Sequence, residues 1–354
     1  MAASPPVNPG RFWRFSRTRL APSPTGALHL GHARTFLITW LLARQAGAQI
    51  VMRMEDLDAA RARAESIAQA YDDLRWLGLD WDVGAGLPGA SEQYVQSHRT
   101  AIYAAALARL RAPGVGQARA AIYPCTCTRA RIAEAVAAGG QAPHETDVQV
   151  RYPGTCRGKS REQIVGEAAP PGLGACWRLR VEPGSVGFDD ALMGRQGFDV
   201  AAEAGDFPVT RFGALGPGLA PPPPPAYQLA CVVDDHEMDI DAVIRGDDLL
   251  SSTPRQLLIY RALGYAPPAF GHVGLVIGPD GKRLAKRHGE SRIAQFRAAG
   301  VRPERVVGWV AWRSGQIERP EEMSAAELLR RFDVGRLPRA RVVMAAEDLA
   351  FLRR

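Results

Sequence analysis

The segment RLAPSPTGALHLGHARTFLITWLLARQAG, from Arg19 to Gly47, constrains the fold more than any other part of the chain. It places two prolines, Gly26 and two histidines between a short strand pattern and a long helical pattern. Turn-forming residues at a strand-to-helix junction allow the backbone to approach a ligand closely. The start of a helix offers N–H groups and a positive dipole end to phosphate. The segment therefore predicts a phosphate site in which His29 and His32 donate to phosphate oxygens. The alternative is that the two histidines only cap the helix or lie on the surface.

Strand and helix patterns alternate over the first 112 residues, as they do in proteins with a parallel α/β sheet. Phe36 and Trp40 lie four residues apart on one helical face, and Gly47 is well placed to end that helix. The run QIVMRM is short and apolar, which is typical of a buried strand. We expect strands over 15–22 and 49–54, and helices over 31–46, 61–77 and 98–112.

The cysteines favour a metal site over disulfides. The chain has five cysteines, an odd number, and its N-terminus lacks the apolar stretch of a secretion signal. Cys125, Cys127 and Cys156 cluster within 32 positions, and three thiolates suit a tetrahedral zinc ion. From the spacing alone, His144 is the expected fourth ligand.

The composition changes after residue 112 and changes back near residue 226. The residues between contain the cysteine cluster, β-like pieces and five consecutive prolines, which form a stiff surface spacer. The α/β pattern then resumes with YQLACVVDD, which predicts an apolar strand over 227–235, followed by a helix near 253–263 and a strand from residue 272. We therefore expect a Rossmann-like nucleotide-binding parallel sheet that is split by an insertion. The expected domains are a flexible tail (1–14), the first half of the sheet (15–112), a zinc-binding insertion with a proline-rich loop (113–225), the second half with a basic loop (226–290) and a small helical C-terminal region (291–354).

Three polar segments follow or end predicted strands, at residues 21–32, 55–58 and 245–248. In an open parallel sheet, ligands bind outside the carboxyl ends of the strands. The three segments therefore predict one shared binding site.

The overall charge limits the classes of partner. The formal net charge of +7 favours a polyanion, nucleic acid first, although arginine-rich usage can also reflect the base composition of a genome. No run of 18 apolar residues occurs, so we expect no transmembrane helix, no membrane partner and a cytoplasmic location. Cys176 and Cys231 are expected in the core.

Four blocks stand out in order along the chain: His29-Leu30-Gly31-His32, RMED at 53–56, the 39-residue segment AYQLACVVDDHEMDIDAVIRGDDLLSSTPRQLLIYRALG, and DGKRLAKR at 280–287. The first resembles the HIGH motif of class I aminoacyl-tRNA synthetases. The others resemble blocks of the glutamyl/glutaminyl branch of that class, including its lysine loop. The resemblance covers roughly residues 15–300.

The resemblance implies the roles of individual residues. Enzymes of this family join an amino acid to ATP, chiefly by positioning and charge stabilisation. ATP would be bound with Mg²⁺ as its counter-ion. The implied ATP-binding residues are His29, Gly31, His32 and Lys286, of which the histidines and the lysine are catalytic. The implied glutamate-binding residues are Arg19, Ala21, Ser23, Glu55, Tyr227 and Arg245, with the arginines on carboxylates and Glu55 on the ammonium. Arg283 and Ala285 depart from the usual lysine and serine of the loop.

The pattern C-x-C…Y-x3-C resembles that of the glutamyl-queuosine tRNA(Asp) synthetases, which implies Tyr152 as the fourth zinc ligand. Because 24 residues separate Cys127 from Tyr152, a longer spacing than usual, His144 remains the alternative. Only residues 287–354 follow Lys286, too few for the anticodon-reading domains of a full glutamyl-tRNA synthetase. The resemblance implies a monomer with one zinc that activates L-glutamate without tRNA and transfers it to the queuosine base in the anticodon of tRNA(Asp). The alternatives are a truncated glutamyl-tRNA synthetase that charges a 3′ end and a non-catalytic RNA-binding paralogue.

Overall fold

The computed structural model describes residues 14–58, 60–113, 119–138, 150–159, 163–164, 174–213, 223–282, 284 and 291–353. The predicted flexible tail, except Arg14, and residues 214–222 of the proline-rich loop lie outside these ranges. In chain order the strands and helices are β1 (Arg17–Leu20), α1 (Leu30–Ala46), β2 (Gln49–Met52), α2 (Ala64–Trp76), β3 (Val83–Gly84), α3 (Thr100–Arg111), β4 (Ile122–Cys125), α4 (Arg129–Ala138), β5 (Cys176–Leu179), β6 (Val186–Asp190), β7 (Gly194–Phe198), α6 (Val200–Glu203), β8 (Phe207–Pro208), α7 (Tyr227–Glu237), β9 (Ala242–Gly246), α8 (Ser252–Leu263), β10 (Ala269–Val273), β11 (Val276–Ile277), α9 (Ile293–Ala298), α10 (Pro303–Arg313), α11 (Ala325–Arg331), β12 (Val342–Val343) and α12 (Ala346–Leu352).

The α/β sheet expected from the alternating pattern is present in two halves that meet at β1 and β9. Strand β2 pairs in parallel with β1 and β3, and β10 pairs in parallel with β9 and β6. Between the halves, Asp241 N donates to Arg17 O at 3.1 Å, and Thr18 Oγ1 donates to Ala242 O at 2.8 Å. Because β7 is antiparallel to β6, the sheet is mixed rather than wholly parallel.

Helix α1 begins at the histidine pair because the two side chains cap it. His29 is the N-cap residue, and its Nδ1 accepts from Gly31 N at 3.1 Å. His32 Nδ1 accepts from His29 N at 3.2 Å, which completes a capping box. Gly47 ends the helix with a φ of +64°, a conformation that glycine adopts without strain. The capped start of α1 therefore fixes both histidines beside the end of β1.

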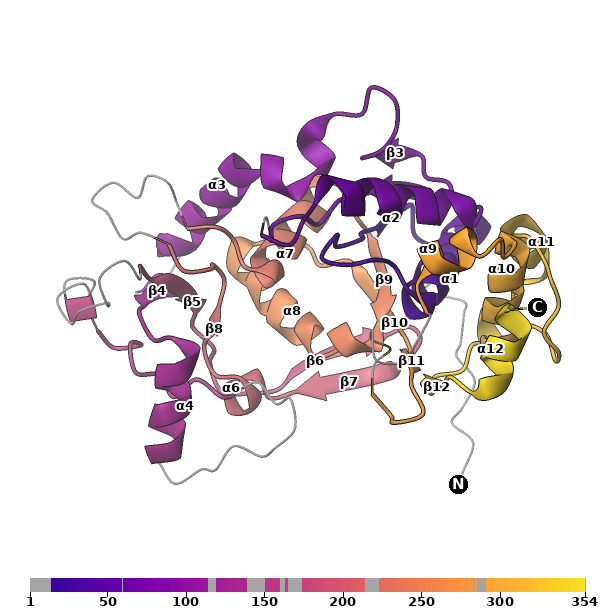
Figure 1. Ribbon diagram of the computed structural model, residues 1–354. Coiled ribbons are helices and arrows are strands. Elements are labelled where there is room, and N and C mark those ends of the chain that lie inside the picture. The colour runs from indigo at the N-terminus through magenta and orange to yellow at the C-terminus, as the bar shows by residue number, and fades with distance from the viewer. Residues whose placement is uncertain are drawn as a thin grey trace.

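The strand predicted over 227–235 is wrong, because these residues form helix α7. Residues 229–235 are all buried, and the helix packs against α3 and α8 (Figure 1). A helix that is buried on every side has no polar stripe, so periodicity cannot separate it from a buried strand. The last two buried residues of this run, Asp234 and Asp235, therefore enter the interior from a helix rather than from the end of a strand.

Residues 113–225 contribute to two different sheets. Strands β4, β5 and β8 form a small antiparallel sheet, which lies with α4 on the side of the molecule away from the C-terminal helices (Figure 1). Strands β6 and β7, in contrast, extend the main sheet through the pairing of β6 with β10. The hairpin 186–198 thus belongs by its hydrogen bonds to the second half of the main sheet.

The region after residue 291 is mostly helical, as expected from its pattern. Helices α10 and α12 are joined by Asp348, whose Oδ1 accepts from Trp309 Nε1 at 2.7 Å. The short strand β12 pairs with β11, which ties this region to the end of the main sheet. Among the described helices, none has both the length and the apolar character needed to cross a bilayer.

Candidate active site

Three strand ends bring charged residues to one edge of the main sheet. Arg19 lies near the end of β1, Glu55 follows β2, and Arg245 lies near the end of β9. The carboxyl ends of parallel strands share one edge, where open α/β sheets bind ligands. Arg19 and Arg245 are only 6% and 5% exposed, and the Glu55 side chain is 8% exposed. Two buried cations and one carboxylate suit a ligand that carries carboxylates and an ammonium group. We call Arg19, Glu55, Tyr227 and Arg245 the charged pocket.

A buried acid, Asp235, links Arg19 to Arg53, which is the ion-pair partner of Glu55. Arg53 Nη1 donates to Asp235 Oδ1 at 2.6 Å, and Arg19 Nε lies 3.6 Å from the same oxygen. Arg53 Nη2 also donates to Glu55 Oε1 at 3.1 Å. Burial lowers the pKa of Arg19, and the Asp235 carboxylate opposes this shift. Asp235 and Arg53 therefore hold Arg19 and Glu55 in fixed relation to each other.

Arg245 is held in a different way, by neutral groups. Its Nε donates to His272 Nε2 at 3.0 Å, and its Nη2 donates to Thr253 Oγ1 and Gln256 Oε1, each at 2.8 Å. Within the described part of the chain, no carboxylate accepts a hydrogen bond from its guanidinium. Among the described residues, the Arg245 guanidinium is therefore held by neutral acceptors and forms no ion pair of its own.

The loop after β1 and the start of α7 complete the charged pocket. Ser23 Oγ donates to Glu55 Oε2 at 3.4 Å, and Ala21 is partly exposed in the same loop. Glu55 N donates to Pro22 O at 3.0 Å, which joins the loop to the end of β2. Tyr227 begins α7 and is 36% exposed. The charges of Arg19, Glu55 and Arg245 contribute to the shift of the pKa of its hydroxyl, so Tyr227 lies near them. The six residues expected at a glutamate site thus come from four segments: β1 with the loop after it, the end of β2, the start of α7 and β9.

The histidine pair presents one nitrogen of each ring to the backbone. The two rings stack with their centroids 3.8 Å apart. Because each Nδ1 accepts from a backbone N–H, each neutral ring carries its proton on Nε2. A Cβ at Gly31 would lie 3.0 Å from His29 Cε1, so a larger residue there would crowd the His29 ring. Together with the dipole of α1, the imidazole N–H groups suit phosphate oxygens.

The lysine loop lies largely outside the described residues, including Arg283, Ala285 and Lys286. The segment that follows the loop is described from Ser291 onward. Ser291 O accepts from Leu30 N at 2.9 Å, and Ile293 N donates to Leu28 O at 2.9 Å. The chain therefore returns from the lysine loop directly beside the histidine pair.

The sequence-predicted thiols gather around Tyr152 in a buried cluster. The Sγ atoms of Cys125, Cys127 and Cys156 lie within 4.8 Å of one another. Tyr152 Oη lies 3.4 Å from Cys125 Sγ and 4.0 Å from Cys127 Sγ, and Cys127 Sγ lies 3.6 Å from Cys156 Sγ. A tetrahedral centre with metal–sulfur bonds of about 2.3 Å has sulfur–sulfur edges near 3.8 Å and sulfur–oxygen edges near 3.5 Å. These four residues, here called the cysteine cluster, therefore can hold a metal ion. The alternative ligand, His144, lies outside the described residues.

Two further contacts shape the cysteine cluster. Hydrogen bonds from Cys127 and the other neighbouring thiols lower the pKa of Cys125, which favours a thiolate there. Arg178 Nε donates to Cys125 Sγ at 3.2 Å, and its guanidinium lies 3.9 Å from the centroid of the Tyr152 ring. Cys176, expected in the core, is buried and its Sγ donates to Cys125 O at 3.5 Å. Arg178 thus supports two members of the cluster at once.

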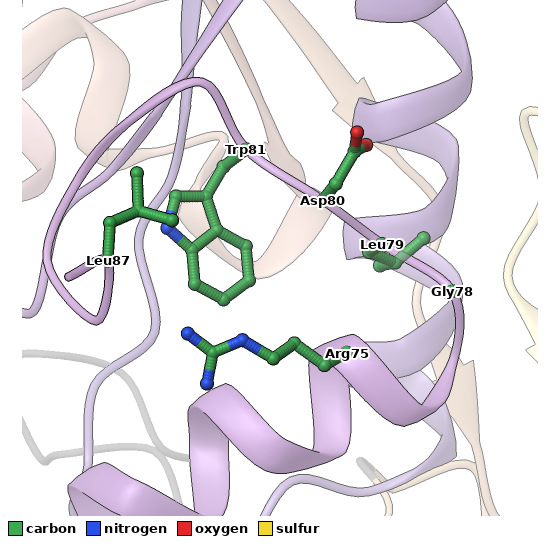
Figure 2. A pocket seen from close by; sticks show the side chains of 6 residues that line it. All are labelled: Arg75, Gly78, Leu79, Asp80, Trp81 and Leu87. Atoms are coloured by element: carbon green, nitrogen blue, oxygen red, sulfur yellow. The ribbon is translucent and has the colours of Figure 1, made fainter.

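A surface pocket at the opposite edge of the sheet is separate from these sites. Its lining is formed by Arg75, Gly78, Leu79, Asp80, Trp81 and Leu87, and the Arg75 guanidinium stands 4.9 Å from the centroid of a Trp81 ring (Figure 2). Residues 78–81 connect α2 to β3 at the amino edge of the parallel strands, whereas Arg75 lies in the last turn of α2 and Leu87 follows β3. None of the six lining residues belongs to the charged pocket or to the cysteine cluster.

Three buried residues that support the charged pocket were missed by sequence reasoning: Asp235, Asp190 and His272. Asp235 ends an apolar run, and an acid within such a run was the one available signal. Asp190 and His272 lie in β6 and β10, strands that are remote in sequence from the motif blocks of β1 and β2. Cys231 was expected only as a core residue, yet its Sγ lies 3.6 Å from Glu55 Oε1.

Comparison with known proteins gives consistent results at three levels. The family model described as the catalytic domain of class I tRNA synthetases (E and Q) matches residues 16–351. The chain is 47% identical over 336 residues to a glutamyl-Q tRNA(Asp) synthetase of Symbiobacterium thermophilum, which covers 94% of this chain and 97% of that protein. It is 44% identical over 301 residues to the protein of that name from Nitratidesulfovibrio vulgaris, covering 85% of this chain and 87% of that protein. Among solved structures, a glutamate tRNA ligase from Elizabethkingia meningosepticum in complex with its amino acid aligns with a TM-score of 0.75 at 26% identity, over 95% of this chain and 68% of that chain.

Proposed function

The chain belongs to the class I tRNA synthetases for glutamate and glutamine, and we propose that it activates L-glutamate with ATP, without tRNA, and transfers the glutamyl group to the queuosine base in the anticodon of tRNA(Asp). It is a ligase. The substrate assignment rests on its relatives named glutamyl-Q tRNA(Asp) synthetase, which it matches over nearly their whole length. The longer glutamate tRNA ligase matches it over only part of that chain.

The proposed specificity for glutamate rests on the charges of the charged pocket. Glutamate has two carboxylates and one ammonium group, and the pocket has two buried guanidiniums, of Arg19 and Arg245, and the carboxylate of Glu55. Guanidiniums bind carboxylates through paired, charge-assisted hydrogen bonds. In the proposed complex, Arg245 binds the side-chain carboxylate and Glu55 binds the ammonium group. Ala21, Ser23 and Tyr227 complete the walls.

The adenylation step demands positioning more than covalent work by the protein. An oxygen of the glutamate α-carboxylate attacks the α-phosphorus of ATP, and the bond from that phosphorus to pyrophosphate breaks. His29 and His32 hold the triphosphate at the start of α1, together with Gly31. Lys286 neutralises the charge that develops on the leaving pyrophosphate, and Mg²⁺ serves as the phosphate counter-ion. A queuosine hydroxyl then attacks the glutamyl carbonyl, and AMP leaves.

We propose zinc as the metal of the cysteine cluster, with Cys125, Cys127, Tyr152 and Cys156 as its ligands. Three thiolates and one oxygen form a closed donor set, which is typical of a structural zinc site. The separations within the cluster fit a tetrahedral centre, and Cys156 N donates to Tyr152 Oη at 2.8 Å, which orients that oxygen toward the sulfurs. We further propose that the protein acts as a monomer, which sedimentation at working concentrations tests.

ATP–pyrophosphate exchange tests the first half of the proposal. Purified protein with glutamate, ATP and Mg²⁺, and with no tRNA, should exchange labelled pyrophosphate into ATP. Lys286→Ala should slow the exchange about 10²–10³-fold with little change in the glutamate KM, because one charge-stabilising group is lost. Exchange that appears only when tRNA is added would contradict tRNA-independent activation.

Transfer of [¹⁴C]glutamate distinguishes the proposal from charging of a 3′ end. The expected acceptor is tRNA(Asp) that carries queuosine, and the same tRNA without queuosine should accept nothing. Periodate-treated tRNA serves as a further control, since periodate destroys both vicinal diols. A signal of equal size with queuosine-free tRNA would favour the 3′-end alternative, which the similarity to a glutamate tRNA ligase supports. Exchange without transfer to either tRNA would exclude both acceptors.

A further inference from the structure

A buried chain of hydrogen bonds leads from Arg245 through His272 to Asp190. Arg245 Nε donates to His272 Nε2 at 3.0 Å, and His272 Nδ1 lies 2.5 Å from Asp190 Oδ2. Both Asp190 and His272 have side chains with no exposed surface. Asp190 ends β6, His272 lies in β10 and Arg245 in β9, so the chain crosses three neighbouring strands.

The backbone fixes which oxygen of Asp190 meets the imidazole. Asp190 Oδ1 accepts from three backbone N–H groups, those of Leu192 at 3.0 Å, Met193 at 2.8 Å and His272 at 3.1 Å. Oδ2 is left for His272 Nδ1, which must therefore carry a proton. Arg245 Nε can only donate, so His272 Nε2 accepts and has no proton, and burial lowers the pKa of His272 in agreement with a neutral ring. The ring is then a pure acceptor toward Arg245.

The other contacts of Arg245 agree with this assignment. Arg245 Nη2 donates to Thr253 Oγ1 and to Gln256 Oε1. The Thr253 hydroxyl lies 3.3 Å from His272 Nε2, where it can share that acceptor with Arg245 Nε. Every one of these acceptors is neutral, and the Asp190 carboxylate that contacts His272 is separated from Arg245 by the imidazole ring. The guanidinium is thus held firmly while its positive charge is left for a ligand.

We propose that His272 and Asp190 are positioning residues that orient Arg245 toward the substrate's side-chain carboxylate and so set the preference for glutamate over glutamine. This proposal rests on the proposed function. Glutamine would leave the Arg245 charge unpaired in a buried site, whereas glutamate neutralises it. A carboxylate in direct contact with Arg245 would weaken that difference, and the interposed neutral imidazole avoids it. Neither positioning residue needs to touch the substrate.

Asp190→Asn is the most informative substitution, because it keeps the shape and reverses one hydrogen bond. The Asn oxygen would retain the three backbone donors, so its NH₂ group would face His272 Nδ1. That nitrogen must then accept, its proton moves to Nε2, and two N–H groups confront each other at Arg245. The glutamate KM in ATP–pyrophosphate exchange should rise about 10- to 100-fold, the scale of one lost hydrogen bond to a charged group. The ATP KM should stay at the wild-type value, and discrimination against glutamine should narrow.

His272 variants and a matched control separate positioning from general damage. His272→Gln can place an amide oxygen near the Nε2 position and should keep most of the preference, whereas His272→Asn lacks an acceptor there and should behave as Asp190→Asn does. Asp206→Asn is the control, since Asp206 is equally buried and accepts from the Val181 N–H and from the Tyr123 hydroxyl, but contacts none of the charged pocket. In an Arg245→Gln background, Asp190→Asn should add no further loss.

The outcomes decide the proposal in each case. Unchanged glutamate KM and unchanged preference in folded Asp190→Asn, or equal behaviour of the two His272 variants, would overturn it. Should these variants fail to fold, nitrogen NMR of the wild-type imidazoles decides, because one of the seven histidines must be a neutral ring protonated at Nδ1. Absence of any such ring would overturn the proposal. A wild-type protein without glutamate-dependent exchange would instead contradict the proposed function, and the NMR result would still stand.

Discussion

The charged pocket and the cysteine cluster hold their side chains by different means. In the pocket, charged groups are balanced by other side chains of the fold, as where Asp235 accepts from Arg53. Beneath it, Asp234 accepts from Arg99 Nε at 2.7 Å and from Gln96 Nε2 at 2.7 Å. In the cysteine cluster, thiols and a phenol mainly contact one another, and sulfur is a weak donor and acceptor.

This difference indicates how each region depends on its ligand. The pocket is organised before glutamate arrives, because ion pairs within the chain fix Arg19 and Glu55 and neutral acceptors fix Arg245. The cluster gains most of its cohesion from a bound metal, whose binding free energy is folding free energy for such sites. Changes in the pocket should therefore alter catalysis and leave the metal in place, and changes in the cluster should do the reverse.

The largest expected effect comes from Arg245→Gln. Loss of one partner of a buried charged hydrogen bond costs about 2–5 kcal/mol, so glutamate activation should weaken roughly 30- to several-thousand-fold. The gap between glutamate and glutamine should narrow in the exchange assay, while the zinc content stays at one per chain. Arg19→Gln is the comparison variant. If Arg245→Gln keeps the wild-type preference and Arg19→Gln loses it, then Arg19 holds the side-chain carboxylate.

The second effect tests whether ion pairs organise the pocket. Asp234→Ala leaves Arg99 uncompensated in the interior and should lower the free energy of unfolding by about 3–5 kcal/mol. Asp189→Ala is the control, because its ion pair with Arg195 is largely exposed and should contribute less than about 1 kcal/mol. Denaturant titrations of the zinc-loaded proteins measure both. Equal stabilities for the two variants would contradict the role of the buried ion pairs in organising the pocket.

The third effect lies in the cysteine cluster. Arg178→Met removes the donor to Cys125 and the cation over the Tyr152 ring, and such outer contacts typically change metal affinity about 10–100-fold. Competition with a zinc chelator measures the change. Arg180→Met is a matched control, since Arg180 lies two residues further along the chain and stacks on Tyr123 rather than on a ligand. Similar zinc affinities in the two variants would contradict the supporting role of Arg178.

The smallest expected effect is a pH dependence of the free energy of unfolding, caused by the buried carboxyl group of Asp73. Asp73 is fully buried, its Oδ2 has no hydrogen-bond partner among the described residues, and burial raises its pKa to about 6. The folded protein therefore binds this proton more tightly than the unfolded chain does. The contribution of the Asp73 proton to the free energy of unfolding is complete below about pH 4 and is lost as the pH rises through about 6.

Asp73→Asn removes this dependence. Relative to the wild type, the variant should gain about 1–3 kcal/mol of stability between pH 5 and pH 8. Denaturation midpoints at several pH values measure the gain, and the exposed neighbour Asp72 provides the control as Asp72→Asn. A difference between Asp73→Asn and wild type that does not change with pH would refute the assignment.

The sheet, and the edge of the sheet at which the candidate site lies, could be predicted from the sequence because both depend on local patterns. Apolar runs that end abruptly in polar residues marked β1 and β2, and parallel strands necessarily bring Arg19 and Glu55 to one edge. Helix α7 was misread because it is buried on every side and shows no periodic polar stripe. His272 could not be predicted as a partner of Arg245, since β10 gives no sign of which strand it will pair with.

The contact between β1 and the start of β9 has a consequence for how the chain is made. Thr18 bonds to Ala242, a residue 224 positions later in the chain. At about 5–20 residues per second, a ribosome needs roughly 10–45 s to synthesise that stretch. During this time one side of β1 remains an open strand edge, which can pair with other chains. The insertion between the two halves of the sheet therefore imposes a delay in which the nascent protein is exposed to aggregation, and half of its future active site waits for the other half to leave the ribosome.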